Sequence, residues 1–136
     1  MVYVDNSKLQ KWIDTLKTGS AGEMVALYSF SSILLPTLSS QMRISYESKL
    51  DYFKHFLSKK PKVTAVYDIQ EQYGKITDRV ILSGNYDFEF EDGAIAKARF
   101  TFVYDAKSDL ILTHHSSLQP ETKDMFTASI DSNFVF

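Results

Sequence analysis

The chain has 136 residues, a formal net charge of −2 and no cysteine. Its length predicts one domain, and the lack of cysteine excludes disulfides and thiolate zinc ligands and favours a reducing, cytoplasmic location, with a trimmed signal peptide as the alternative. Charges of both signs are mixed along the chain, which argues against nucleic-acid binding, and no apolar run reaches the roughly 20 residues that cross a membrane.

Two helices are predicted at the start of the chain. In the first, large apolar residues recur at i, i+3, i+4 and i+7 and form one buried stripe. These residues are Leu9, Trp12, Ile13 and Leu16. Residues 5–7 offer caps, and Gly19 marks the end. The second helix begins with Ser20-Ala-Gly-Glu23, a capping box in which the Ser20 oxygen and the Glu23 side chain each satisfy a free backbone N–H.

A short strand over residues 30–35 follows and is closed by Pro36, and another short strand is expected around 41–44. Ser45 then caps a third helix, which Pro61 ends. The buried stripe of this helix is expected to be Tyr46, Leu50, Phe53 and Leu57.

From residue 63 the apolar pattern changes to a period of two, which is typical of half-buried strands. Four long antiparallel strands are expected over 63–70, 80–91, 94–104 and 110–117. The turns between them are Tyr73-Gly-Lys75, a type I′ turn at Glu91-Asp-Gly93 and residues 105–109. Helices followed by strands predict an α+β fold, in which a strongly bent sheet curls over the helices and leaves a cone-like cavity.

The end of the chain is more apolar than a solvated tail. Its large apolar residues are Met125, Phe126, Ile130, Phe134, Val135 and Phe136. We therefore divide the chain into a domain at 1–121 and an apolar extension at 122–136, which we expect to dock on its own domain or on a neighbouring subunit.

Two adjacent histidines and two hydroxyls follow the last apolar strand residues. Neighbouring residues of a strand point to opposite faces, so His114 shares a face with Ser116, and His115 shares the other with Ser117. This separation argues against a two-histidine metal site. Each histidine is either a hydrogen-bonded core or interface residue, or it lines the cavity.

Arg99 lies in the middle of an otherwise apolar strand. Either its guanidinium binds an anion or a carboxylate in the cavity, or it is half of a structural ion pair. Tyr52 and Tyr86 are further candidates for the cavity lining. No residue is assigned to catalysis, a cofactor or a metal. The candidate ligand-binding residues are Arg99, His114, His115, Ser116, Tyr52 and Tyr86.

Six short motifs occur in a characteristic order and spacing. They are Val25-Ala-Leu-Tyr28, Leu34-Leu-Pro-Thr-Leu-Ser39, Tyr52-Phe53, Ser83-Gly-Asn-Tyr86, Ala98-Arg-Phe-Thr-Phe-Val103 and His114-His-Ser-Ser-Leu-Gln-Pro-Glu121. Together they resemble the association, or hub, domain of calcium/calmodulin-dependent protein kinase II, within the nuclear-transport-factor-like (SnoaL-like) superfamily. The resemblance covers about residues 9–121 and implies a cone-shaped, curved antiparallel sheet with about three N-terminal helices in its concave face.

The resemblance also implies a function. Hub domains form dimers that assemble into stacked rings, so the expected function is homo-oligomerisation, with the chain itself as the partner. Arg99 corresponds to a cavity arginine of the kinase hub, His115 to a histidine of its final strand, and Ser116 to the position of a second arginine. Since the wider superfamily includes isomerases and cyclases, the alternative is a small-molecule-binding protein or enzyme that takes a small carboxylate-like ligand. We favour the non-enzymatic module.

Overall fold

The body of the molecule is a five-stranded sheet with the strand order β1-β5-β4-β3-β2. The computed structural model describes residues 4–37 and 39–120. In these residues the strands are β1 (Tyr28–Leu35), β2 (Lys62–Gly74), β3 (Arg79–Glu89), β4 (Ile95–Asp105) and β5 (Ile111–Leu118). The helices are α1 (Ser7–Lys17), α2 (Ala21–Val25) and α3 (Tyr46–Ser58).

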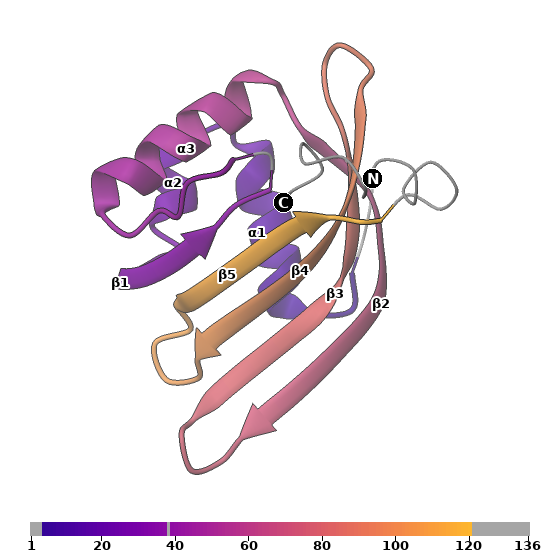
Figure 1. The fold of residues 1–136 in the computed structure, drawn as a ribbon. Helices are drawn as coiled ribbons and strands as arrows, with labels where there is room; N and C mark the ends of the chain where they lie inside the picture. Colours follow the sequence, from indigo (N-terminus) through magenta and orange to yellow (C-terminus); the bar gives the residue numbers. More distant parts are fainter. Residues whose placement is uncertain (1–3, 38, 121–136) are drawn as a thin grey trace.

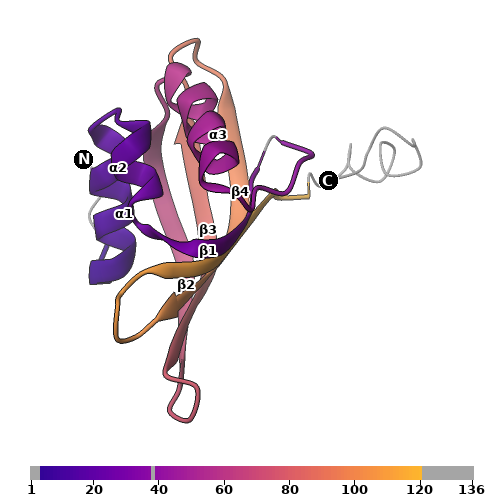
Figure 2. The same cartoon turned by 90° about the vertical axis from the view of Figure 1, so that its left-hand side faces the viewer.

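All three helices lie on one side of the bent sheet, as Figures 1 and 2 show. Neighbouring strands from β5 to β2 are antiparallel. β1 joins the outer edge of β5 in the parallel direction, with Leu34 beside His114 and Leu35 beside His115. The predicted α+β fold, with a curved sheet around the helices, is confirmed, and the parallel edge strand is an addition to it.

The predicted helix caps are present. The side chain of Asn6 accepts the N–H of Leu9 at 3.1 Å, and Ser20 Oγ accepts the N–H of Glu23 at 3.2 Å. The second half of the capping box is wrong, because the N–H of Ser20 donates to Thr18 Oγ1 at 3.2 Å and not to Glu23.

The predicted buried stripe of the third helix is confirmed for Phe53, and Leu50 and Leu57 pack partly buried against the core, whereas the prediction for Tyr46 is wrong. Ser45 caps it as expected, but Tyr46 is 45% exposed and Lys49 is only 1% exposed. The buried face consists of Lys49, Phe53 and Phe56, because the apolar stem of the lysine covers the core in place of an aliphatic side chain. The strand expected at 41–44 is reduced to one antiparallel bridge between Leu34 and Arg43.

Two local predictions about the strands are wrong. At the β3–β4 connection only Gly93 has a positive φ (89°), whereas a type I′ turn needs two such residues. The N–H of Gly93 donates to the carbonyl of Phe90 at 2.9 Å, which makes a three-residue loop. In β2 the regular alternation is interrupted by register shifts, one of them around Asp68, whose φ is 57°.

The core lies between the helices and the concave face of the sheet and is dominated by aromatic rings. Trp12 of α1 is at its centre, with ring centroids 5.8 Å from Tyr86, 5.7 Å from Phe102 and 5.7 Å from His114. No helix of the described residues is long and apolar enough to cross a membrane. The predicted extension at 122–136 and its docking lie outside the described residues.

Candidate functional site

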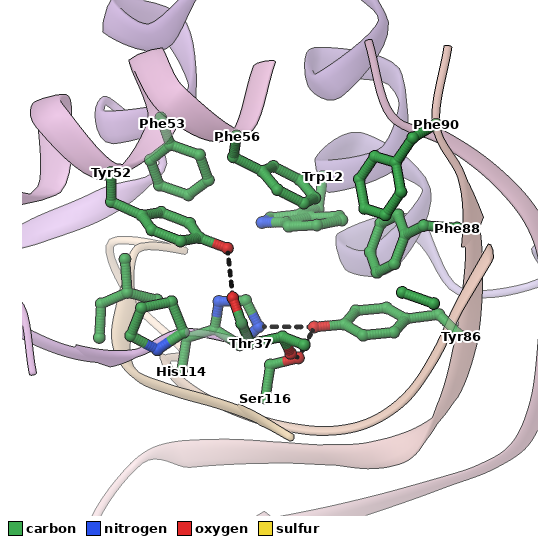
Figure 3. A pocket seen from close by; sticks show the side chains of 13 residues that line it. Trp12, Thr37, Tyr52, Phe53, Phe56, Tyr86, Phe88, Phe90, His114 and Ser116 are labelled. Carbon is green, nitrogen blue, oxygen red and sulfur yellow. Dashed lines mark hydrogen bonds between the residues drawn. The ribbon is translucent and has the colours of Figure 1, made fainter. Parts of the chain in front are cut away.

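A pocket lies in the concave face of the sheet, beneath α3 (Figure 3). Thirteen described residues line it: Trp12, Leu34, Pro36, Thr37, Tyr52, Phe53, Phe56, Tyr86, Phe88, Phe90, Ala96, His114 and Ser116. Its free space is about 10 Å³, which is room for roughly one water molecule. Small-molecule sites usually offer about 300–1,000 Å³, so the aromatic side chains almost fill this one.

A chain of hydrogen bonds begins at Trp12, one of the lining residues. Its Nε1 donates to the hydroxyl of Tyr28 at 3.1 Å, and this hydroxyl lies 2.7 Å from Nδ1 of His114. All three side chains are buried. The sequence positions of these partners are distant, since Tyr28 and His114 are 86 residues apart.

The same chain continues through His114 to the pocket wall (Figure 3). The Nε2 atom lies 3.2 Å from the hydroxyl of Tyr86, which donates to Ser116 Oγ at 2.6 Å. Ser116 Oγ in turn bonds to Thr37 Oγ1. The hydroxyl of Tyr52, from α3, donates to the backbone carbonyl of Thr37 at 3.2 Å.

The donor-to-acceptor direction of these hydrogen bonds follows from Trp12, the first residue of the chain. An indole N–H can only donate, so the oxygen of Tyr28 accepts, and the proton of Tyr28 is directed to Nδ1 of His114. A neutral imidazole then carries its proton on Nε2 and donates it to Tyr86. The hydroxyls of Tyr28 and Tyr86 each accept one bond and donate one, and the chain runs from Trp12 to Thr37.

The groups in this chain are neutral near neutral pH. Burial, with a smaller contribution from the charge of His115, lowers the pKa of His114 to about 3. Burial also raises the pKa of Tyr28 and of Tyr86 well above the ordinary value for a phenol. General acid–base catalysis works best with a pKa close to the working pH, so these three side chains are suited to structural hydrogen bonding and not to proton exchange.

Four of the six candidate residues lie together in this pocket: Tyr52, Tyr86, His114 and Ser116. Their role in ligand binding stays a prediction. The separation of His114 from His115 by strand parity is confirmed, since His114 is buried and His115 is exposed.

Arg99 and His115 are outside the pocket, and the prediction that Arg99 lines the cavity is wrong. Its neighbours Ala98 and Phe100 are buried on the concave side, so alternation along β4 directs Arg99 to the other face, where it is exposed. His115 is exposed on the same face of β5, where it is paired with Thr101. The pocket therefore presents hydroxyls and a neutral imidazole, without a cation to receive a carboxylate.

Sequence reasoning missed Thr37 as a partner in the pocket network, and it counted Tyr28 among the tyrosines that could line the cavity without predicting its bonds to Trp12 and His114. Thr37 follows the strand-ending Pro36 and reads as a loop residue, and nothing in its neighbourhood signals burial. In the described residues no three side chains of histidine, aspartate or glutamate gather as metal ligands would.

Comparison with solved structures identifies the family. A candidate calcium/calmodulin-dependent protein kinase II association domain from Xanthomonas campestris is 34% identical to this chain, covers 84% of it and 84% of its own length, and superposes with a TM-score of 0.77. The chain belongs to the calcium/calmodulin-dependent protein kinase II association-domain family. No protein-family model matches the chain, and a search among curated proteins finds no match either.

More distant structures share the fold of this association domain. An NTF2-like protein from Pseudomonas putida is 8% identical, with 88% of this chain and 87% of that chain covered and a TM-score of 0.71. A candidate dehydratase of the NTF2-like family from Streptomyces avermitilis is 9% identical, with coverages of 83% and 91% and a TM-score of 0.70. At these identities the likeness extends to the fold alone.

Proposed function

We propose that this association domain is a homo-oligomerisation module that pairs through the outer face of its sheet. The observation that carries the proposal is the one-sided covering of the sheet. Helices cover the concave face, whereas the alternate residues of β4 on the other face are exposed or half-buried. An open sheet face with the half-buried Ile81 and Val103 side by side is suited to packing against a second sheet.

The register of the strands shows which residues form this outer face. Thr113, Val103 and Ile81 lie side by side in one row across β5, β4 and β3. The next row holds His115, Thr101 and Ser83. In a twofold dimer the same face of both copies meets, so these two rows would face their own copies.

The almost filled pocket supports assembly over ligand binding. A free space of about 10 Å³ does not admit a metabolite unless aromatic side chains move, and none of the thirteen described lining residues is a lysine or an arginine. Assembly into rings, as hub domains are expected to form, and a cytoplasmic location are part of the same proposal and stay predictions.

Substitution on the outer face tests the proposal. Val103→Glu places a charge in the centre of the apolar row, and it is expected to reduce the native mass to that of a monomer while the circular dichroism spectrum is retained. The matched control is Ile76→Glu, since Ile76 is fully exposed at the β2–β3 hairpin tip, and its mass is expected to equal that of the wild type. An unchanged mass for Val103→Glu would contradict the choice of face.

The alternative function is binding of a small molecule in the pocket, which the chain of hydroxyls ending at Thr37 favours. A thermal-shift screen with small carbonyl and carboxylate compounds tests it. A true ligand at a hundredfold excess over its Kd adds about 2.7 kcal/mol to the free energy of unfolding. Ser116→Ala is expected to abolish the shift, whereas Arg99→Ala, outside the pocket, is expected to retain it.

A further inference from the structure

An exposed apolar cluster lies at the β1 edge of the domain. Leu34 and Arg43 exchange both backbone hydrogen bonds, at 3.0 and 2.8 Å, so antiparallel pairing places Ile33 opposite Ile44 and Leu35 opposite Met42. Leu34 is buried, and its strand neighbours therefore point outward. The exposed fractions are 38% for Ile33, 36% for Leu35, 52% for Met42 and 52% for Ile44. We call these four residues the ribbon patch.

The chain leaves the sheet close to the ribbon patch. β5 runs parallel to β1, as Figure 1 shows, and Leu35 is paired with His115. β5 ends only three residues later, at Leu118, roughly 10 Å further along the strand. Residues 121–136 follow, and these 16 residues span up to about 50 Å when extended. The whole ribbon patch is therefore within their reach.

The composition of this last segment complements the surface beside β5. It carries six large apolar residues, and Glu121, Asp124 and Asp131 outnumber the single cation Lys123. The outer face at this end of the sheet exposes the basic side chains of Lys97 and Arg99, and neither has a carboxylate within ion-pair distance among the described residues. The N–H of Gln119 donates to the carbonyl of Lys97 at 2.8 Å, which directs the chain past these cations.

We propose that residues 122–136 fold back on their own domain and cover the ribbon patch. The apolar side chains of the segment contact Ile33, Leu35, Met42 and Ile44, and its acidic residues face Lys97 and Arg99. Covalent attachment favours this docking within one chain, because a short tether gives an effective concentration on the order of millimolar. The ribbon patch adjoins the face proposed for assembly, since Ile33 is paired with Thr113 and Leu35 with His115, so docking of the segment and pairing of the sheets are measured separately.

Engineered cysteine pairs in the full-length chain test the docking, and the cysteine-free sequence provides a clean background. Met42→Cys is combined in turn with Met125→Cys, Ile130→Cys or Phe134→Cys, and disulfide formation under mild oxidation is followed on non-reducing gels. At least one pair is expected to close about tenfold faster than the matched control, in which Ile76→Cys replaces Met42→Cys. The product is expected to run at the mass of a single chain.

The possible results distinguish docking within one chain from its alternatives. Rates equal to the control for all three pairs would show that the segment does not dock on the ribbon patch. A product at the mass of two chains would show that the segment crosses to a second copy and would overturn docking within one chain. Native mass is measured on the same samples before oxidation, so failure of the docking and failure of the proposed assembly are read separately.

Discussion

Trp12 Nε1 donates to the hydroxyl of Tyr28 at 3.1 Å, and this one bond orients the hydrogen-bond chain beyond it. Because the indole donates to the Tyr28 oxygen, the Tyr28 proton is free to be donated to Nδ1 of His114, 2.7 Å away. Tyr28 therefore links an obligate donor to the imidazole, and both of these groups are buried.

Tyr28→Phe removes this link and tests how much it contributes to the stability of the fold. The change leaves the Trp12 N–H and the His114 Nδ1 atom without partners, and each unsatisfied buried group costs about 1–3 kcal/mol. We expect the free energy of unfolding in urea to fall by about 2–4 kcal/mol. The control is Tyr73→Phe, whose hydroxyl bonds to Asp78 on the surface at 3.0 Å and whose loss is expected to cost less than about 1 kcal/mol. Equally small losses for the two variants would show that the buried hydrogen-bond chain contributes little to the free energy of unfolding.

His114 predicts a dependence of stability on pH. Its pKa is about 3 in the folded protein and near 6.5 in an unfolded chain, so below pH 6.5 the unfolded state binds a proton that the folded state does not. Stability therefore falls as the pH falls from about 6.5 towards 3, by about 1.4 kcal/mol per pH unit at most. Urea unfolding between pH 4.5 and 6.5 measures the slope. His114→Gln is expected to remove the part of this slope that corresponds to about one proton. A slope identical to that of the wild type would exclude His114 as the source of the pH dependence.

Gly84 is predicted to be intolerant of a side chain. A Cβ atom there would lie 2.9 Å from Cζ of Phe100 and 3.3 Å from the Cα of Ile69, and Phe100 is itself buried in the core. We expect Gly84→Ala to lower the free energy of unfolding by about 1–3 kcal/mol. Gly22→Ala, in α2 with its nearest contact at 3.9 Å, is expected to raise it by up to about 1 kcal/mol. If Gly84→Ala is as stable as Gly22→Ala, the close approach of Phe100 does not prevent a side chain at position 84.

Lys49 is a buried cation with one weak partner. Its Nζ donates to the carbonyl of Phe30 at 3.4 Å, and burial lowers its pKa. A methionine keeps the stem and removes the desolvated charge, so we expect Lys49→Met to leave thermal stability unchanged or to raise it by about 1 kcal/mol. Lys54→Met, at an exposed position of the same helix, is the control and is expected to stay within about 0.5 kcal/mol. A loss of more than about 2 kcal/mol in Lys49→Met alone would reveal an ion pair that the ammonium needs.

Local patterns in the sequence predicted the elements and their caps well. Asn6, Ser20 and Ser45 cap the three helices because capping depends on contacts between residues three apart. Alternation correctly placed Tyr86, Phe88 and Phe90 together in the core. The parallel addition of β1 was missed, because pairing across 80 residues leaves no local pattern.

The candidate site was predicted only in part, for a related physical reason. Alternation separates His114 from His115 but does not tell which of them faces the helices. For Arg99, the flanking residues Ala98 and Phe100 decide the face, and a small alanine gives little indication of burial in a sequence. The bonds from Trp12 to Tyr28 and from Tyr28 to His114 join distant segments, so they required the structure.

The native mass in solution tests the central claim most directly. Size-exclusion chromatography with light scattering at micromolar concentration is expected to give at least twice the chain mass of 15.6 kDa, because the outer sheet face pairs with a second copy. Val103→Glu is expected to reduce this value to one chain mass, and Ile76→Glu is expected to leave it unchanged. A wild-type protein that elutes with a mass of 15.6 kDa would contradict the account.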